Sequence, residues 1–265
     1  EVKDGLSYST TYSYTPQDDI SGISDASSNL TSFVYDSLQR KTSQNDPDMG
    51  MWEYKYDGVG NITEQTDNRD VTITKTYDEL NRVTLVNYPT DTDITYTYDG
   101  NSKKGTLTTV VDKAGTVNYS YDNRLRKTQE QRTVNGTTKI TQFSYDAADR
   151  TTTQTNPDGE VITYAFNTQG ETNSVTGSSS ILSNIDYNAL GKITSKSFAN
   201  GLTTNYTYNT DDFRLNRIQT SSIQDLNYTY DAVGNITTIF DDVVDKTKTF
   251  DYDDLDRLTT ASESA

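Results

Sequence analysis

Tyrosines recur along this chain with a period of about 21 residues, and that spacing constrains its fold more than any other feature. Most units contain an aromatic-x-aromatic triplet such as Tyr54-Lys55-Tyr56. The second aromatic of successive triplets lies at Tyr14, Tyr35, Tyr56, Tyr77, Tyr98, Tyr121, Tyr145, Phe166, Tyr187, Tyr208, Tyr230 and Tyr252. A fixed period of this length indicates a repeat architecture, in which each unit packs on its neighbours. We therefore expect one array of about twelve repeats over residues 1–265.

Each unit has the sequence pattern of a β-hairpin. Residues i and i+2 of a strand face the same side, so each triplet places both rings on one face of a sheet. Asp or Asn follows the second aromatic in all units but the first, where it is Thr15. This pattern is typical of a type I turn that ends in a residue with positive φ and a β-bulge. The residues expected at that last position are Gly60, Asn81, Asp149, Gly170, Gly191, Asp212, Gly234 and Asp256.

A second set of turn signals separates each return strand from the next triplet, as at Asp46-Pro47-Asp48 and Asn200-Gly201. Two strands per unit give about 24 strands. The longer gaps at 98–121 and 121–145 are expected to hold extra loop residues. No capped amphipathic helical stretch is present. The fold class predicted is all-β: tandem β-hairpin repeats that form one continuous, curved and spiralling antiparallel sheet.

Composition excludes several functions. The chain has no cysteine and no histidine, which rules out disulfides, Cys/His zinc sites and Ser-His-Asp or Cys-His catalysis within it. Its net charge is −16, whereas nucleic acids and anionic membranes require a basic surface. We therefore predict no nucleic-acid partner. The chain also starts and stops without a terminal feature, so we expect a fragment of a longer protein.

Two functional interpretations of the repeated residues compete with structural ones. The tyrosines could form a sugar-binding ladder, but packing between neighbouring hairpins explains them better. The aspartates could form calcium sites or catalytic pairs, yet they recur in every unit and no calcium-loop motif accompanies them. Five units carry Arg four residues after the Asp, and a turn-capping Asp paired with Arg accounts for both. These pairs are Asp36/Arg40, Asp78/Arg82, Asp122/Arg126, Asp146/Arg150 and Asp253/Arg257.

Units such as YDGVGNIT at 56–63, YDELNRVT at 77–84 and YDAVGNIT at 230–237 resemble the YD repeats of bacterial RHS proteins, insecticidal toxin complexes and animal teneurins. The resemblance covers essentially the whole chain. It implies a sheet that spirals into a hollow shell, often around a toxin segment or other cargo. The RHS core region that ends the shell in that family, and the C-terminal toxin, have no counterpart in this sequence.

The resemblance implies a structural role: an open segment of a shell wall that encloses or presents a toxin, an effector or another polypeptide. The alternative is a surface adhesin-like module that binds glycan or protein through exposed Tyr and Asp rows. The partners expected are the rest of the parent polypeptide, including an enclosed C-terminal toxin or cargo, and other copies through edge-to-edge association. The parent is expected to be secreted or displayed on a bacterial surface.

We predict no enzyme activity, no catalytic residue, no metal and no cofactor. The residues expected to hold the repeats together are Tyr35, Asp36, Tyr56, Asp57, Gly60, Tyr77, Asp78, Tyr98, Asp99, Tyr121, Asp122, Tyr145, Asp146, Tyr187, Gly191, Tyr208, Tyr230, Asp231, Gly234, Tyr252 and Asp253.

Overall fold

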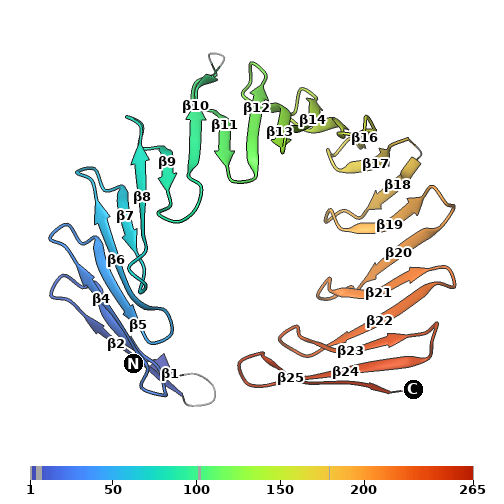
Figure 1. Ribbon diagram of the computed structural model, residues 1–265. Coiled ribbons are helices and arrows are strands. Elements are labelled where there is room, and N and C mark those ends of the chain that lie inside the picture. Colours follow the sequence, from blue (N-terminus) through green and yellow to red (C-terminus); the bar gives the residue numbers. More distant parts are fainter. Residues whose placement is uncertain (1, 4–7, 101–102, 179, 265) are drawn as a thin grey trace. The chain divides into compact units, whose positions relative to one another are not determined.

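The computed structural model describes residues 2–3, 8–100, 103–178 and 180–264, which form β-strands joined by turns (Figure 1). The chain divides into two compact units, Glu1–Ile140 and Thr141–Ala265. No α-helix occurs among these residues, and none of them forms an apolar helix long enough to cross a membrane. The all-β prediction is confirmed.

Strands in the first unit are β1 (Val2–Lys3), β2 (Ser9–Tyr14), β3 (Ile20–Ser24), β4 (Leu30–Tyr35), β5 (Lys41–Asp46), β6 (Gly50–Tyr56), β7 (Ile62–Thr66), β8 (Thr72–Tyr77), β9 (Val83–Asn87), β10 (Ile94–Tyr98), β11 (Leu107–Asp112), β12 (Gly115–Tyr121) and β13 (Lys127–Val134). The unit boundary falls within β14 (Thr137–Tyr145). The second unit continues with β15 (Thr151–Thr155), β16 (Val161–Phe166), β17 (Thr172–Thr176), β18 (Ser180–Tyr187), β19 (Ile193–Phe198), β20 (Thr203–Tyr208), β21 (Leu215–Thr220), β22 (Gln224–Tyr230), β23 (Ile236–Asp241), β24 (Lys246–Tyr252) and β25 (Leu258–Ser264).

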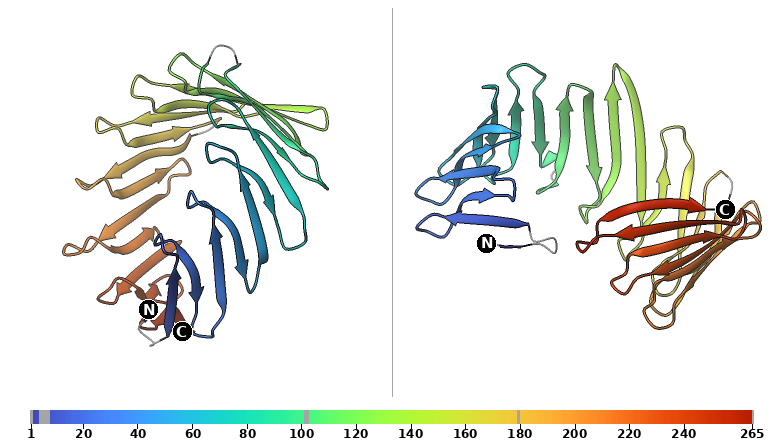
Figure 2. Two further views of the ribbon diagram at one scale, coloured as in Figure 1. Left: turned by 90° about the vertical axis from the view of Figure 1, so that its left-hand side faces the viewer. Right: turned by 90° about the horizontal axis from the view of Figure 1, so that it is seen from below.

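From β1 to β13, and again from β14 to β25, each strand pairs antiparallel with the next one along the chain, as β6 does with β5 and β7. The strands of each unit form a twisted, curved sheet, and turns join consecutive strands at both ends (Figures 1 and 2). β-Strands twist because side-chain and carbonyl sterics rotate each strand against its neighbour. The tandem-hairpin prediction is therefore confirmed, while the joining of all repeats into one domain stays a prediction.

The expected β-bulge lies at the second aromatic of every repeat. In the hairpin of β6 and β7, Lys55 pairs with Glu64 but Tyr56 pairs with Ile62, so one residue of the return strand is skipped. The same register shift recurs at the last residue of β2, β4, β8, β10, β12, β14, β16, β18, β20, β22 and β24. A bulge interrupts the ladder of backbone hydrogen bonds and bends the strand. The repeat therefore has one fixed irregularity next to its turn.

Positive φ occurs where the turn pattern predicts it, at Gly60 (102°), Gly191 (72°) and Gly234 (113°). The expectation for Asp212 is wrong, because Phe213 takes the positive φ instead (56°). The amide of Phe213 donates to the carbonyl of Asn209 at 3.2 Å, one residue further along than in the standard turn. The extra residue of this 22-residue repeat thus lengthens its turn and moves the left-handed position by one.

The two long repeats absorb their extra residues differently. Eight residues separate β10 from β11, against five between β4 and β5, so the first insertion lies in a loop as expected. The second expectation is wrong: β13 has eight residues and β14 nine, and only two residues join them. A sequence rich in Thr and Gln can lengthen the flanking strands as easily as it can lengthen a loop.

Few hydrophobic side chains are fully buried in either sheet. Among the described residues, only Val86 and Ile185 are buried hydrophobic side chains. In β6 the side chains of Trp52, Tyr54 and Tyr56 are half-buried, whereas the alternate residues are exposed. One face of the strand is therefore partly covered and the other exposed, so stability depends on contacts between neighbouring hairpins.

Candidate functional site: the turns that join successive repeats

The turn after the second aromatic is organised by the side chain of its first residue. In the turn between β6 and β7, Asp57 Oδ1 accepts hydrogen bonds from the amides of Val59 (3.0 Å), Gly60 (2.8 Å) and Asn61 (2.9 Å). The turns that begin at Asp36, Asp78, Asp99, Asp122, Asp146, Asp231 and Asp253 also use Oδ1 as an acceptor for turn amides. Asn188 makes the same bonds with an amide oxygen. The aspartates are thus engaged in holding backbone.

The five predicted Asp–Arg pairs are all present, each with a closest nitrogen–oxygen distance of 2.7 Å. In the first of them, Asp36 Oδ2 accepts a hydrogen bond from Nε of Arg40 and lies 2.7 Å from its Nη2. These bonds favour the ionised carboxylate. The pKa of Asp36 is lowered by its side-chain bond to Arg40 and by the turn amides, and that of Asp57 by its side-chain bond to Asn61 and by the turn amides.

Acid should destabilise this protein through these turns. Because the folded-state pKa of Asp57 lies below the unfolded value, its contribution is present above the unfolded pKa and is lost as pH falls through the folded one. Asp57→Asn keeps an acceptor oxygen for the turn amides, as Asn188 does in its own turn. The asparagine side chain cannot titrate. We expect the variant to lose less stability than the natural protein between about pH 6 and about pH 3, measured by urea unfolding. Identical losses would contradict the assignment.

Nine tyrosines at the second aromatic position donate their hydroxyl to the backbone of the preceding repeat. Tyr56 Oη donates to the carbonyl of Lys41 at 2.7 Å, and Lys41 is the residue paired with Tyr35 at the bulge of the preceding repeat. The hydroxyls of Tyr35, Tyr77, Tyr98, Tyr121, Tyr187, Tyr208, Tyr230 and Tyr252 make the same bond at 2.7–3.0 Å. Nine bulges are therefore tied to the tyrosine of the next repeat, which accounts for tyrosine at these positions.

A second link between repeats involves the residue just before each return strand, which we call the closing residue. In four repeats it is an arginine whose guanidinium carbon lies 4.3–5.6 Å from the centroid of the next repeat's second aromatic, and in one it is Lys192, at 5.1 Å from Tyr208. These arginines are Arg40, Arg82, Arg150 and Arg214. Arg40 also donates to the carbonyl of Asp57 at 2.8 Å. One cation thus contacts its own turn and the next ring.

Sequence reasoning found the Asp–Arg pairs but missed the contacts to the next repeat. The signal was present, since the closing residue is basic in seven of the twelve repeats. Two repeats use Asn61 and Asn235 here, whose amides bond to their own turn's Asp and to Asn81 and Asp256 of the next turn. Two others carry an acid, Asp19 and Glu171. Phe166 has no hydroxyl and so lacks the tyrosine bond.

The repeated polar residues of these turns are engaged in structural contacts. Over the described ranges, no cluster of three or more His, Cys, Asp or Glu residues could hold a metal ion. The carboxylates that recur in the turns accept hydrogen bonds from their own turn backbone. The arrangement can connect hairpins, and its chemistry is that of repeated structural contacts.

Comparison with known proteins agrees with this architecture. A family model described as RHS Repeat matches residues 56–93 and 145–179. No curated protein matches the sequence. The TcdB2–TccC3 crystal structure is similar to the chain with a TM-score of 0.85 at 20% identity, over 96% of this chain and 16% of that one. TcdB2–TccC3 without its hypervariable C-terminal region gives 0.84 and 20%, over 96% and 15%.

A Tc holotoxin pore from Photorhabdus luminescens with a mutation in TccC3 also matches, with a TM-score of 0.84 at 20% identity over 95% of this chain and 15% of that one. The chain therefore spans about one sixth of the length of these structures, and at this identity the similarity shows the fold. Two segments of the chain therefore match the RHS Repeat model, and the solved structures share the fold of almost the whole chain.

Proposed function

We propose that this chain is a wall segment of an RHS-repeat shell, and that the shell encloses or presents another polypeptide of its parent protein. The observation that carries the proposal is the use of the repeated polar groups. Nine tyrosine hydroxyls, together with the turn aspartates, bind neighbouring backbone. Side chains committed in this way make a continuous wall, and we propose that the segment has no catalytic activity and needs no cofactor.

The similar structures support the choice of partner and location. They include TcdB2–TccC3 and a Tc holotoxin pore that carries a TccC3 mutation. By analogy we propose that the partner of this segment is the rest of its own polypeptide, including a C-terminal toxin or other cargo, and that the parent is secreted or displayed on a bacterial surface.

Limited proteolysis tests the proposal. The complete parent protein is compared with a version in which the C-terminal segment is expressed without the repeats, and the half-life of that segment under protease is measured. A wall that excludes protease should lengthen the half-life at least tenfold, because cleavage then requires opening of the sheet. Digestion at the same rate in both proteins rejects encapsulation.

A surface-binding role is the second candidate. It is favoured by exposed aliphatic side chains in consecutive turns of the first unit. Leu38, Val59 and Leu80 occupy the same position of three consecutive turns and are 66%, 73% and 68% exposed. Such a row could contact a glycan or protein. Saturable binding on a glycan array that is lost in a Leu38→Ser, Val59→Ser, Leu80→Ser variant would favour this role over the wall.

A further inference from the structure

The closing residue determines what lies over the tyrosine of the next repeat. Where it is Arg40, Arg82 or Lys192, a cation of this chain covers the ring. Arg82 also forms ion pairs with Asp78 and Asp99, at 2.7 and 2.6 Å. The repeat geometry is therefore built to hold a cation between a turn carboxylate and an aromatic face.

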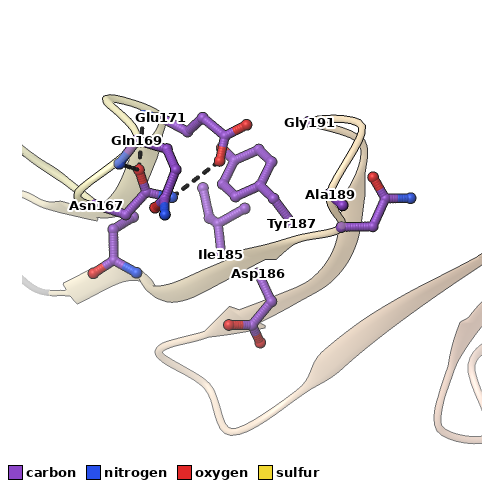
Figure 3. Close-up of a pocket in the computed structure, with 10 residues that line it drawn as sticks. Asn167, Gln169, Glu171, Ile185, Asp186, Tyr187, Ala189 and Gly191 are labelled. Carbon is purple, nitrogen blue, oxygen red and sulfur yellow. Dashed lines mark hydrogen bonds between the residues drawn. The ribbon is translucent and has the colours of Figure 1, made fainter.

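The repeat whose closing residue is Glu171 has an acid in place of the cation, and its turn begins with Asn167 instead of an aspartate. Its turn and the next one border an open pocket of about 560 Å³, lined by Asn167, Glu171, Ile185, Tyr187 and other residues (Figure 3). The carboxylate of Glu171 lies beside the Tyr187 ring, where the other repeats place a guanidinium (Figure 3). Its Oε2 accepts from Asn167 Nδ2 at 3.0 Å, and its Oε1 faces Gly191.

In the first unit, the repeat whose closing residue is Asp19 has the same arrangement. Asp19 and Tyr35 line an open pocket of about 470 Å³, together with Thr15, Gln17 and Phe33. In both repeats burial raises the pKa of the tyrosine and the acid's negative charge raises it further. Two separate repeats thus combine an acid at the closing position, an aromatic ring and a pocket.

We propose that the Glu171–Tyr187 and Asp19–Tyr35 pockets are binding sites for the guanidinium group of an arginine side chain supplied by another polypeptide segment. The carboxylate forms the ion pair and the ring provides the face on which the guanidinium stacks. The chain itself shows this combination of contacts, because its own arginines lie over Tyr56, Tyr98, Phe166 and Tyr230 while each pairs with an aspartate of its own turn. The −16 net charge of the chain attracts basic segments to it.

Guanidinium is favoured over ammonium by the geometry of the filled repeats. Among the described residues, four of the five closing-position cations placed over a ring are arginines, and Arg82 contacts two carboxylates while it lies over Tyr98. A planar guanidinium can stack on a ring and at the same time form a two-point ion pair with a carboxylate. An ammonium offers only one point charge. An arginine side chain should therefore bind more tightly than a lysine side chain.

The test is a titration of the 265-residue chain with N-acetylarginine amide at low salt, followed through the ring signals of individual tyrosines in ¹H–¹³C NMR spectra. Tyr187 and Tyr35 should shift in a saturable manner with a Kd on the order of 10 mM. Tyr56 and Tyr208, whose faces are already covered, should not shift. N-acetylcitrulline amide, the neutral analogue of the same shape, should leave all four unchanged, and the lysine amide should bind several-fold more weakly.

Substitutions at matched turns give the strongest control. Glu171 and Lys192 close turns of the same Asn-x-x-Gly form. Glu171→Arg should fill the first pocket from within and abolish the Tyr187 shift, while Tyr35 still responds. Lys192→Glu removes the cation that lies 5.1 Å from the Tyr208 centroid and should create a third responding ring. Glu171→Gln keeps the shape without the charge and should weaken binding about three- to tenfold.

Several results would overturn the proposal: equal shifts at all tyrosines, equal binding of the citrulline analogue, an unchanged affinity in Glu171→Gln, or no saturation at about 100 mM ligand. These measurements use this chain alone. A failed protease test of the parent therefore leaves the sites standing, and absent arginine binding leaves the wall standing.

Discussion

Tyr56→Ala should lower the free energy of unfolding of its region by about 3 kcal/mol, the cost of removing a large ring from a packed position. The ring lies under Arg40, with 4.8 Å from the guanidinium carbon to the ring centroid, and its hydroxyl is bonded to the carbonyl of Lys41. The truncation removes both contacts and leaves that carbonyl at the bulge without its donor.

Tyr56→Phe is the matched control, since it keeps the ring and the stacked arginine and removes only the hydroxyl. It should cost about 1 kcal/mol, the usual net value of one such hydrogen bond. Hydrogen exchange should locate the effect in β5, β6 and β7 and leave β20 to β23 unchanged, because each repeat contacts only its neighbours. Equal losses for Ala and Phe, or faster exchange throughout the chain, would show that the ring is not the local link described above.

Gly115→Ala should be the most damaging single methyl that this sheet can receive, at about 3 kcal/mol or more. Gly115 begins β12 with a φ of 142°, and a Cβ there would overlap the backbone carbonyl oxygen of Thr133 in β13. Backbone is less able to move aside than a flexible side chain, so β12 and β13 would have to separate.

Gly159→Ala separates the clash from the backbone conformation. Gly159 also has a positive φ, 91°, but a Cβ there meets no atom within 4 Å. Its substitution should cost about 1 kcal/mol, the price of a left-handed conformation for a residue with a side chain. The two variants are compared by urea unfolding, and similar midpoints would mean that β12 and β13 are not paired as closely as described.

Much of this architecture was readable from the sequence because it is governed by local conformation. The spacing from Tyr56 through Asp57 to Gly60 specifies a turn in which the carboxylate accepts backbone amides and the last residue adopts positive φ. Where a repeat contains an extra residue, the local rule shifts with it, which is why Phe213 replaced Asp212. Strand length at β13 and β14 escaped prediction because a polar, Thr-rich stretch fits a strand or a loop equally well.

The links between repeats were decided by tertiary structure. The Tyr56 hydroxyl reaches the carbonyl of Lys41, 15 residues earlier, only because β4 to β7 lie side by side and the bulge turns that carbonyl toward the next repeat. Likewise the sequence shows Glu171 as one acid among many, and only the sheet places its carboxylate beside the Tyr187 ring. Residue spacing fixes conformation along one chain segment, whereas contacts across hairpins depend on strand pairing and twist, which no single repeat contains.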